Sequence, residues 1–125
     1  MTTTIRLAGG VPILEPKGKI IGTTGNELKE RLVSQIEDAH APCVLIDFEN
    51  VYRIDSTGMG ALVMAYIEAK RKGGRIGIIN VGTKIRSLIV RTQLINLFQY
   101  FEDEDAAVTA LSNIINENKP YVQSL

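Results

Sequence analysis

The chain has 125 residues, enough for one hydrophobic core and too few for a second domain. Its 14 basic and 14 acidic residues cancel, and because the bases are scattered we exclude nucleic acid and anionic membranes as direct partners. Hydrophobic residues make up 45% of the sequence, yet no apolar run reaches the roughly 18 residues of a membrane span, so we expect a cytoplasmic globular protein.

The first 40 residues predict a β-hairpin followed by a helix. Apolar stretches separated by Gly9-Gly10 and by the segment 16–18 predict two antiparallel strands. Residues 24–39 then carry apolar side chains at helical spacing, and Thr24 with Glu27 forms a capping-box pattern at their start. The stripe expected to be buried consists of Leu28, Leu32, Ile36 and Ala39.

The rest of the chain alternates strands with helices. The apolar runs 43–48 and 75–81 predict two strands, the first of them central and covered on both faces. Helices are predicted over 57–72 and from a cap at Thr83 to about residue 92. A short strand follows within 93–101, and the acidic run 102–105 marks the start of a last helix. The side chains expected to face the core from these helices are Met59, Leu62, Val63, Tyr66, Ile67, Ile85, Leu88, Ile89, Ala107, Val108, Leu111, Ile114 and Ile115.

This order of elements predicts an α/β fold in a single domain, residues 1–125. Strands joined by crossover helices form a largely parallel sheet, and the opening hairpin makes that sheet mixed, with about four helices flanking it. The single cysteine, Cys43, lies in an apolar strand, where we expect a buried thiol. With His40 as the single histidine, the chain has too few ligands for a metal site, and we expect neither metal nor cofactor.

The segment "RIDSTGMGALV", residues 53–63, follows the central strand, where sheets of this class gather functional groups. Asp55, Ser56 and Thr57 are residue types that cap helices, so one interpretation is purely structural. A phosphate-binding loop would need a lysine and a glycine spacing that the segment lacks. A catalytic serine would need a base, and His40 is the only histidine, so we predict no enzymatic activity.

A fourth interpretation is that another protein phosphorylates Ser56 or, as the less favoured site, Thr57. The phosphate would carry a charge of about −1.5 to −2 and would meet free N–H groups at the positive end of the helix dipole. Asp55 would orient the hydroxyl during transfer, while the small Gly58 and Gly60 would let a partner's backbone come close. We therefore predict a switch in which the phosphate acts on a docking partner.

Residues 44–98 combine an apolar strand, the sequence D-S-T-G-M-G, a helix ended by Gly73-Gly74, another strand and the segment T-Q-L-I-N-L-F. In this order they resemble the STAS domain of bacterial anti-sigma factor antagonists. The resemblance covers the remaining residues by the order of their elements. It implies a mixed sheet that begins with a hairpin and carries its helices on one face.

The resemblance also implies partner switching. In this family the unphosphorylated antagonist binds an anti-sigma factor that is also a serine kinase, of the histidine-kinase-like ATPase type, and thereby frees a sigma factor. The kinase phosphorylates the serine that corresponds to Ser56, a serine phosphatase restores it, and Asp55 corresponds to the residue that supports the transfer. The contact loop and helix start correspond to Thr57, Gly58, Met59 and Gly60.

One segment departs from the family pattern. Antagonists of this type usually carry G-E-[LI]-D after the second strand, whereas residues 18–21 here are G-K-I-I. Lys19 thus reverses a charge and Ile21 removes one, which in an interface weakens binding or redirects it to another partner. The sequence leaves open a divergent kinase, a pathway outside sigma control, a non-switching scaffold or transporter-associated STAS subunit, nucleotide binding at the same loop, and a homodimer.

Overall fold

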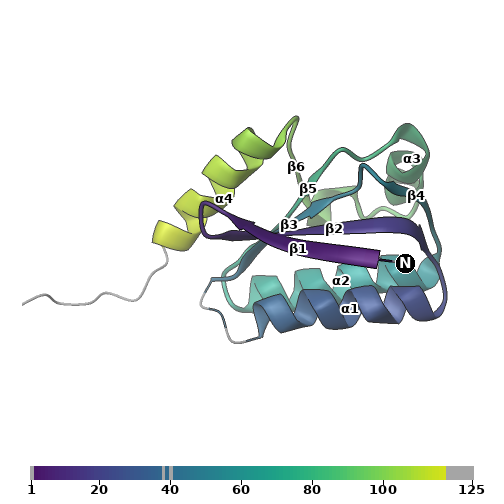
Figure 1. Cartoon of the computed structure of the whole chain (residues 1–125), viewed down its shortest axis with the longest axis horizontal. Helices are drawn as coiled ribbons and strands as arrows, with labels where there is room; N and C mark the ends of the chain where they lie inside the picture. The colour runs from purple at the N-terminus through teal and green to yellow at the C-terminus, as the bar shows by residue number, and fades with distance from the viewer. Residues whose placement is uncertain (1, 38, 40, 118–125) are drawn as a thin grey trace, which may run out of the picture.

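A computed structural model describes residues 2–37, 39 and 41–117. The described residues form a mixed sheet with the strand order β1-β2-β3-β5-β6, and β4 pairs with the end of β2 (Figure 1). His40 lies outside the described residues. The elements are β1 (Thr2–Ala8), β2 (Val11–Ile20), α1 (Thr23–Ile36), β3 (Cys43–Asp47), β4 (Val51–Ile54), α2 (Ser56–Arg71), β5 (Arg75–Ile79), α3 (Thr83–Arg91), a 3-10 turn (Ile95–Leu97), β6 (Gln99–Tyr100) and α4 (Glu104–Glu117).

The hairpin and the sheet follow the predicted pattern. β1 and β2 pair antiparallel around the turn at Gly9 and Gly10, whose φ angles of 57° and 80° lie in the left-handed region that glycine adopts readily. The pairs β2–β3, β3–β5 and β5–β6 are parallel. The predicted fold class, a mixed α/β sheet with an opening hairpin and four helices, is confirmed.

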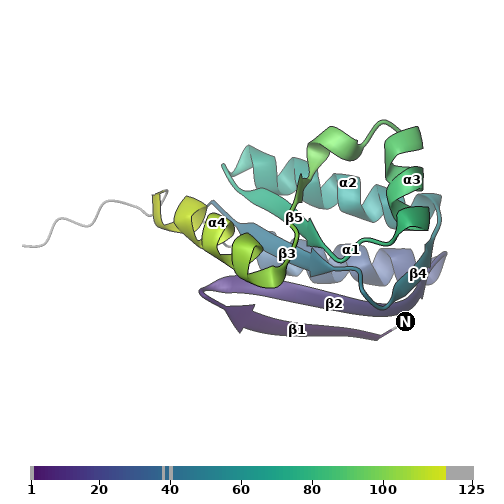
Figure 2. The same cartoon turned by 90° about the horizontal axis from the view of Figure 1, so that it is seen from above.

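Two separate hydrophobic clusters cover the two faces of this sheet. Leu14 and Ile46 belong to the cluster beneath α1 and α2, whereas their neighbours Ile13 and Leu45 belong to the cluster beneath α4. Figures 1 and 2 show α4 on the face opposite to α1 and α2. The expectation of helices on one face only is therefore wrong, because a strand that is apolar on both faces must be covered on both.

Glycines precede two helices at which the sequence predicts a threonine cap. Gly22, with φ 55°, is the N-cap of α1, and Thr24 lies inside the first turn, where its Oγ1 accepts a hydrogen bond from Ile21 N at 2.7 Å. Gly82 likewise precedes α3, and Thr83 is the first helical residue with no side-chain cap. The predicted capping box and the predicted Thr83 cap are both wrong.

Within the described residues, no helix has the length and apolarity needed to cross a membrane.

The buried side of α2 is built from smaller residues than the sequence suggested. Its buried residues are Gly58, Met59, Ala61, Leu62, Ala65 and Ala69. Ile67, which the apolar spacing placed in the core, is 48% exposed. Helix α1 packs closely against the start of α2, where a Cβ on Gly25 would lie 2.7 Å from Thr57 Cγ2. Small side chains at this contact let the two helices approach.

A short strand, β4, lies between β3 and α2, where the sequence pattern predicts no strand. Its ends, Val51 and Ile54, are buried, and it pairs parallel with Gly18–Ile20 of β2, with a register shift between Gly18 and Lys19. Four residues with two exposed ones between two buried ones show no strand alternation, so tertiary pairing alone produces this strand. Asp55, the residue directly after β4, lies at the start of α2.

Candidate functional site

The motif at residues 55–60 lies where β2 and β4 end and where α1 and α2 begin (Figure 1). Asp55 follows β4 directly, and its backbone N–H donates to Ile20 O at 3.2 Å, which ties it to the end of β2. Its φ and ψ of −107° and −171° are extended, as is usual for an N-cap residue. The motif therefore lies at the carboxyl edge of the sheet, as predicted, but it follows β4 and not the central strand β3 directly.

Asp55 is the N-cap of α2, and its carboxylate connects two helix starts. Oδ1 accepts hydrogen bonds from Thr57 N at 3.0 Å and Gly58 N at 3.1 Å, and Oδ2 accepts one from Gly22 N at 3.0 Å. The backbone N–H of Gly22, followed by that of Gly58, lowers the pKa of Asp55 below its ordinary value. The carboxylate is therefore charged at neutral pH and already engaged with the backbone.

Ser56 is the first residue of α2 and is exposed. Its hydroxyl has no hydrogen-bond partner among the described residues, so the fold does not use this side chain. Of the three residues whose types suit a helix cap, Asp55 takes the N-cap position, and Ser56 and Thr57 lie inside the helix. The N–H groups of Thr57 and Gly58, expected to be free for a phosphate, are bound by Asp55 instead.

Thr57 and the two glycines of the motif have different environments. Thr57 is half-buried, with its methyl group against Gly25 of α1. Gly58 is buried, and a Cβ there would lie 2.5 Å from Ile54 Cγ1 and 2.9 Å from Ile20 O. Gly60 is exposed, and nothing lies within 4 Å of the corresponding position. Gly58 therefore serves internal packing, and only Gly60 leaves room for a partner.

Met59, expected both in the contact loop and among the core-facing residues of the helix, is 6% exposed and belongs to the core, as its helical spacing predicted. The fold therefore removes Gly58 and Met59 from the surface that a partner can touch. These two residues support the motif from below, while Asp55, Ser56, Thr57 and Gly60 retain exposed or half-exposed surface.

One face of α2, which we name the α2 face, extends the motif along the helix and consists of Ser56, Gly60, Met64 and Ile67. Steps of three and four residues put these positions on one side of a helix. Met64 and Ile67 are large apolar side chains with 44% and 48% of their surface exposed. Met64 is not among the site residues predicted from the sequence, although its spacing of eight residues from Ser56 puts it on the same helix face.

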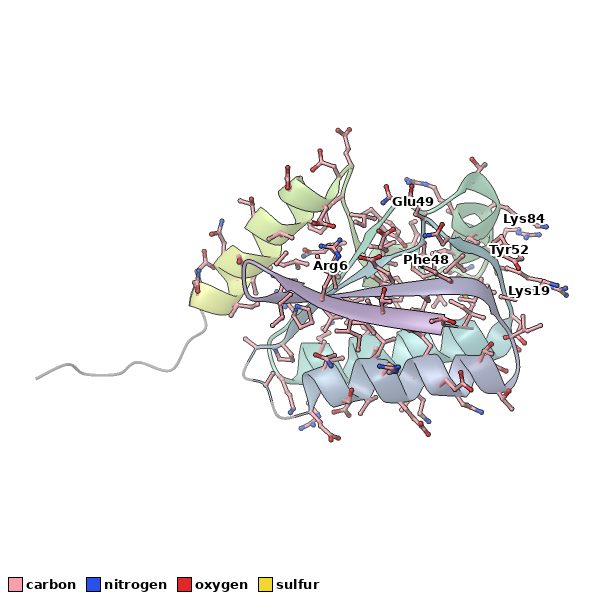
Figure 3. The ribbon with its side chains drawn as sticks, viewed as in Figure 1. Arg6, Lys19, Phe48, Glu49, Tyr52 and Lys84 are labelled. Atoms are coloured by element: carbon pink, nitrogen blue, oxygen red, sulfur yellow. The ribbon has the colours of Figure 1, made fainter. Side chains whose placement is uncertain are left out.

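Lys19 and Ile21, the positions that depart from the family pattern, lie beside the motif. Lys19 is exposed on β2 and is paired in register with Arg53 of β4. Ile21 is half-buried between β2 and α1. In Figure 3 the side chains of Lys19, Tyr52 and Lys84 extend from the same end of the molecule. The charge reversal at Lys19 therefore falls on an accessible surface next to Ser56.

Comparison with known proteins gives a consistent assignment. The model of the STAS domain family matches residues 3–107. The anti-sigma F factor antagonist of Paenibacillus polymyxa is 22% identical over 102 residues, which cover 82% of this chain and 87% of that protein.

Solved structures share the fold. An anti-sigma factor antagonist from Mycobacterium paratuberculosis has a TM-score of 0.76 and 25% identity, with 88% of this chain and 92% of that chain covered. The phosphorylated form of the Bacillus cell fate determinant SpoIIAA has a TM-score of 0.68 and 15% identity, covering 87% and 99%. A sulfate transporter family protein from Wolinella succinogenes has a TM-score of 0.68 and 20% identity, covering 86% and 88%.

Proposed function

The chain belongs to the STAS domain family, and from this premise we propose that it is an anti-sigma factor antagonist that acts by partner switching in the cytoplasm. Its 125 residues form a single STAS domain without enzymatic activity. The unphosphorylated form binds an anti-sigma factor that is also a serine kinase of the histidine-kinase-like ATPase type, and a sigma factor is released. Phosphorylation at Ser56 ends the binding, and a serine phosphatase restores it.

The observation that carries this proposal is the position of Ser56. Its hydroxyl is exposed and unbonded among the described residues, at the first position of a helix whose cap is provided by Asp55. A phosphate at this position disturbs no packing and no hydrogen bond of the fold. It adds a charge of about −1.5 to −2 to a surface that already carries the Asp55 carboxylate. The effect therefore falls on whatever docks there.

Thr57 is a poorer phosphate acceptor than Ser56, because its side chain is less exposed. Its side chain is half-buried against α1, and its methyl group would lie 2.7 Å from a Cβ on Gly25. A phosphate on Thr57 would have to displace that contact between α1 and α2. Exposure favours Ser56.

The α2 face provides the surface that the partner would contact. Exposed apolar side chains such as Met64 and Ile67 lose unfavourable contact with water when a partner covers them. Gly60 between them and Ser56 leaves the helix backbone accessible. A partner seated on this face would lie directly against a phosphate on Ser56, which explains why one modification ends the binding.

The direct test is phosphorylation by a candidate serine kinase encoded in the same operon. We expect ATP-dependent transfer of one phosphate to Ser56 by mass spectrometry and none in Ser56→Ala. Ser87→Ala, which removes an exposed serine of α3, is the matched control and should be modified as wild type. Failure of every such kinase to modify Ser56 in the wild-type protein contradicts the proposal.

Binding to the same kinase separates the switch from the second candidate function, a non-switching scaffold or transporter-associated STAS subunit. The three hydrogen bonds of Asp55 favour this alternative, since they give the motif a complete structural role. Under partner switching, Ser56→Ala binds the kinase and Ser56→Asp binds at least tenfold more weakly. Under the alternative, Ser56→Asp binds its partner as the wild type does, because an acid is favourable at a helix start.

A further inference from the structure

A groove between β4 and α3 lies on the other side of the motif from α1. Tyr52, Arg53 and Ile54 line it from β4, and Lys84, Ile85, Leu88 and Arg91 line it from α3. Its volume is about 160 Å³. Because β4 continues directly into Asp55 and Ser56, this basic groove, as we name it, begins beside the proposed phosphorylation site.

The groove concentrates positive charge in a protein whose formal net charge is zero. Arg53, Lys84 and Arg91 line it, no acidic residue does, and Lys19 lies beside Arg53 in the pairing of β2 with β4. Among the described residues, ion pairs form at Arg6 and Arg71, whereas these four bases have none. Their charges are therefore available to a binding partner.

The floor of the groove is apolar. Ile54 and Ile85 are 7% and 4% exposed, and Leu88 is half-buried between the basic side chains. Tyr52, which also lines the groove, is 63% exposed, so its ring is accessible to a partner. An aromatic side chain beside a small apolar floor and a basic rim is typical of the centre of a protein–protein contact.

We propose that the basic groove binds an acidic segment of the partner protein that carries apolar side chains between its acids. This inference rests on the proposed function and specifies the chemistry of the partner. The acids would pair with Arg53, Lys84, Arg91 and Lys19, and one apolar side chain would enter the groove. Nucleic acid fits less well, because it needs an extended basic track rather than a short groove with an apolar floor.

The sign of the charge also explains how Ser56 controls this surface. A phosphate on Ser56 stands three residues after Arg53 and next to the groove, so it lowers the positive potential that attracts the acidic segment. The same phosphate would strengthen the binding of a basic partner. An acidic partner is thus consistent both with the lysine at position 19 and with the loss of binding when Ser56 is phosphorylated.

The test uses a fluorescein-labelled 14-residue peptide in which Glu and Leu alternate, titrated with the full chain and followed by fluorescence polarisation. We expect the affinity to fall at least tenfold in Arg53→Glu/Lys84→Glu and again when NaCl is raised from 50 to 300 mM. Lys29→Glu, which reverses an exposed base of α1, is the matched control and should stay within twofold of wild type. In ¹⁵N-labelled protein the peptide should shift amide signals of residues 51–54 and 83–91.

Three results would overturn the inference: equal affinity for a Lys/Leu peptide, equal weakening by Lys29→Glu, or shifts confined to residues outside β4 and α3. Displacement of the peptide from these residues by an oligothymidylate, or by vesicles containing phosphatidylserine at equal charge, would assign the groove to nucleic acid or membrane instead. Because the peptide assay contains no kinase, it can succeed while phosphorylation of Ser56 fails, and the converse also holds.

Discussion

Helices α2 and α4 begin with the same chemistry and differ in what surrounds it. Asp55 precedes α2 and accepts hydrogen bonds from Thr57 N and Gly58 N, while Asp103 precedes α4 and accepts one from Ala106 N at 2.8 Å. At α4 the next acid, Glu104, pairs with Arg6 of β1, and one of these bonds measures 3.0 Å. The acids of α4 thus attach the helix to the hairpin.

At α2 the residue after the cap, Ser56, forms no ion pair or hydrogen bond that attaches the helix to another described element. Ser56 is exposed and unbonded among the described residues, and β4, which leads into the helix start, lines the basic groove with Arg53 and Ile54. A phosphate at the start of α4 would meet the acidic run 102–105, whereas at the start of α2 it meets one carboxylate that backbone N–H groups already bind. The comparison shows that a capped helix start becomes a candidate switch only through its surroundings.

The largest effect on the free energy of unfolding should come from substituting the two glycines at the start of α2. Gly58→Ala should lower the free energy of unfolding by about 1–3 kcal/mol, because its Cβ would meet Ile54 and Ile20 in a closed space. Gly60→Ala, two residues on and exposed, should raise it by about 0.5–1 kcal/mol, since alanine stabilises a helix interior relative to glycine. Urea unfolding of both variants measures this difference. Equal effects would show that Gly58 is not closely packed.

Replacing the two capping aspartates, Asp55 and Asp103, should have the next largest effect on stability. Asp55→Ala leaves three backbone N–H groups without their acceptor, on two helices, whereas Asp103→Ala leaves one. We therefore expect a larger fall in the urea midpoint for Asp55→Ala than for Asp103→Ala. Ser56→Ala, the control, should leave the midpoint unchanged. An equal fall for both aspartates would contradict the connecting role of Asp55.

The smallest effect should appear in the response of two carboxyl pKa values to salt. Backbone N–H groups lower the pKa of Asp55, and the Arg6 guanidinium lowers that of Glu104. Both carboxylates thus add stability above the ordinary pKa of about 4, and this contribution disappears as the pH falls through the lowered pKa. Between 50 and 500 mM NaCl, the pKa of Glu104 should rise toward its ordinary value while that of Asp55 stays low, because salt screens an ion pair more than uncharged donors.

Carbon-13 NMR titration of the carboxyl groups measures both pKa values. Arg6→Ala is the control, and it should raise the pKa of Glu104 and leave that of Asp55 in place. A rise at Asp55 as large as that at Glu104 would mean that a charged group, not the backbone, holds the Asp55 carboxylate.

Local patterns predicted a large part of this structure. The hairpin, the α1 stripe of Leu28, Leu32 and Ile36, and the buried strand β3 all follow from periodicity and turn residues. The burial of Cys43, with 2% exposure and a pKa raised mainly by burial, was also predicted. The predictions that failed concern which side of an element is covered: Ile67, expected in the core, is exposed, and Gly58, expected to face a partner, is buried. The burial of Met59 was predicted by its helical spacing.

The sequence by itself determined the order of the elements and the position of the D-S-T-G motif after a strand, because both depend on residues close together in the chain. Only the tertiary structure decided that β4 pairs with β2, that α4 covers the second face of the sheet, and that Asp55 reaches Gly22, 33 positions away. These contacts join residues distant in sequence, and no local propensity encodes them. They leave Ser56 exposed beside a basic groove, and the proposed switch depends on that placement.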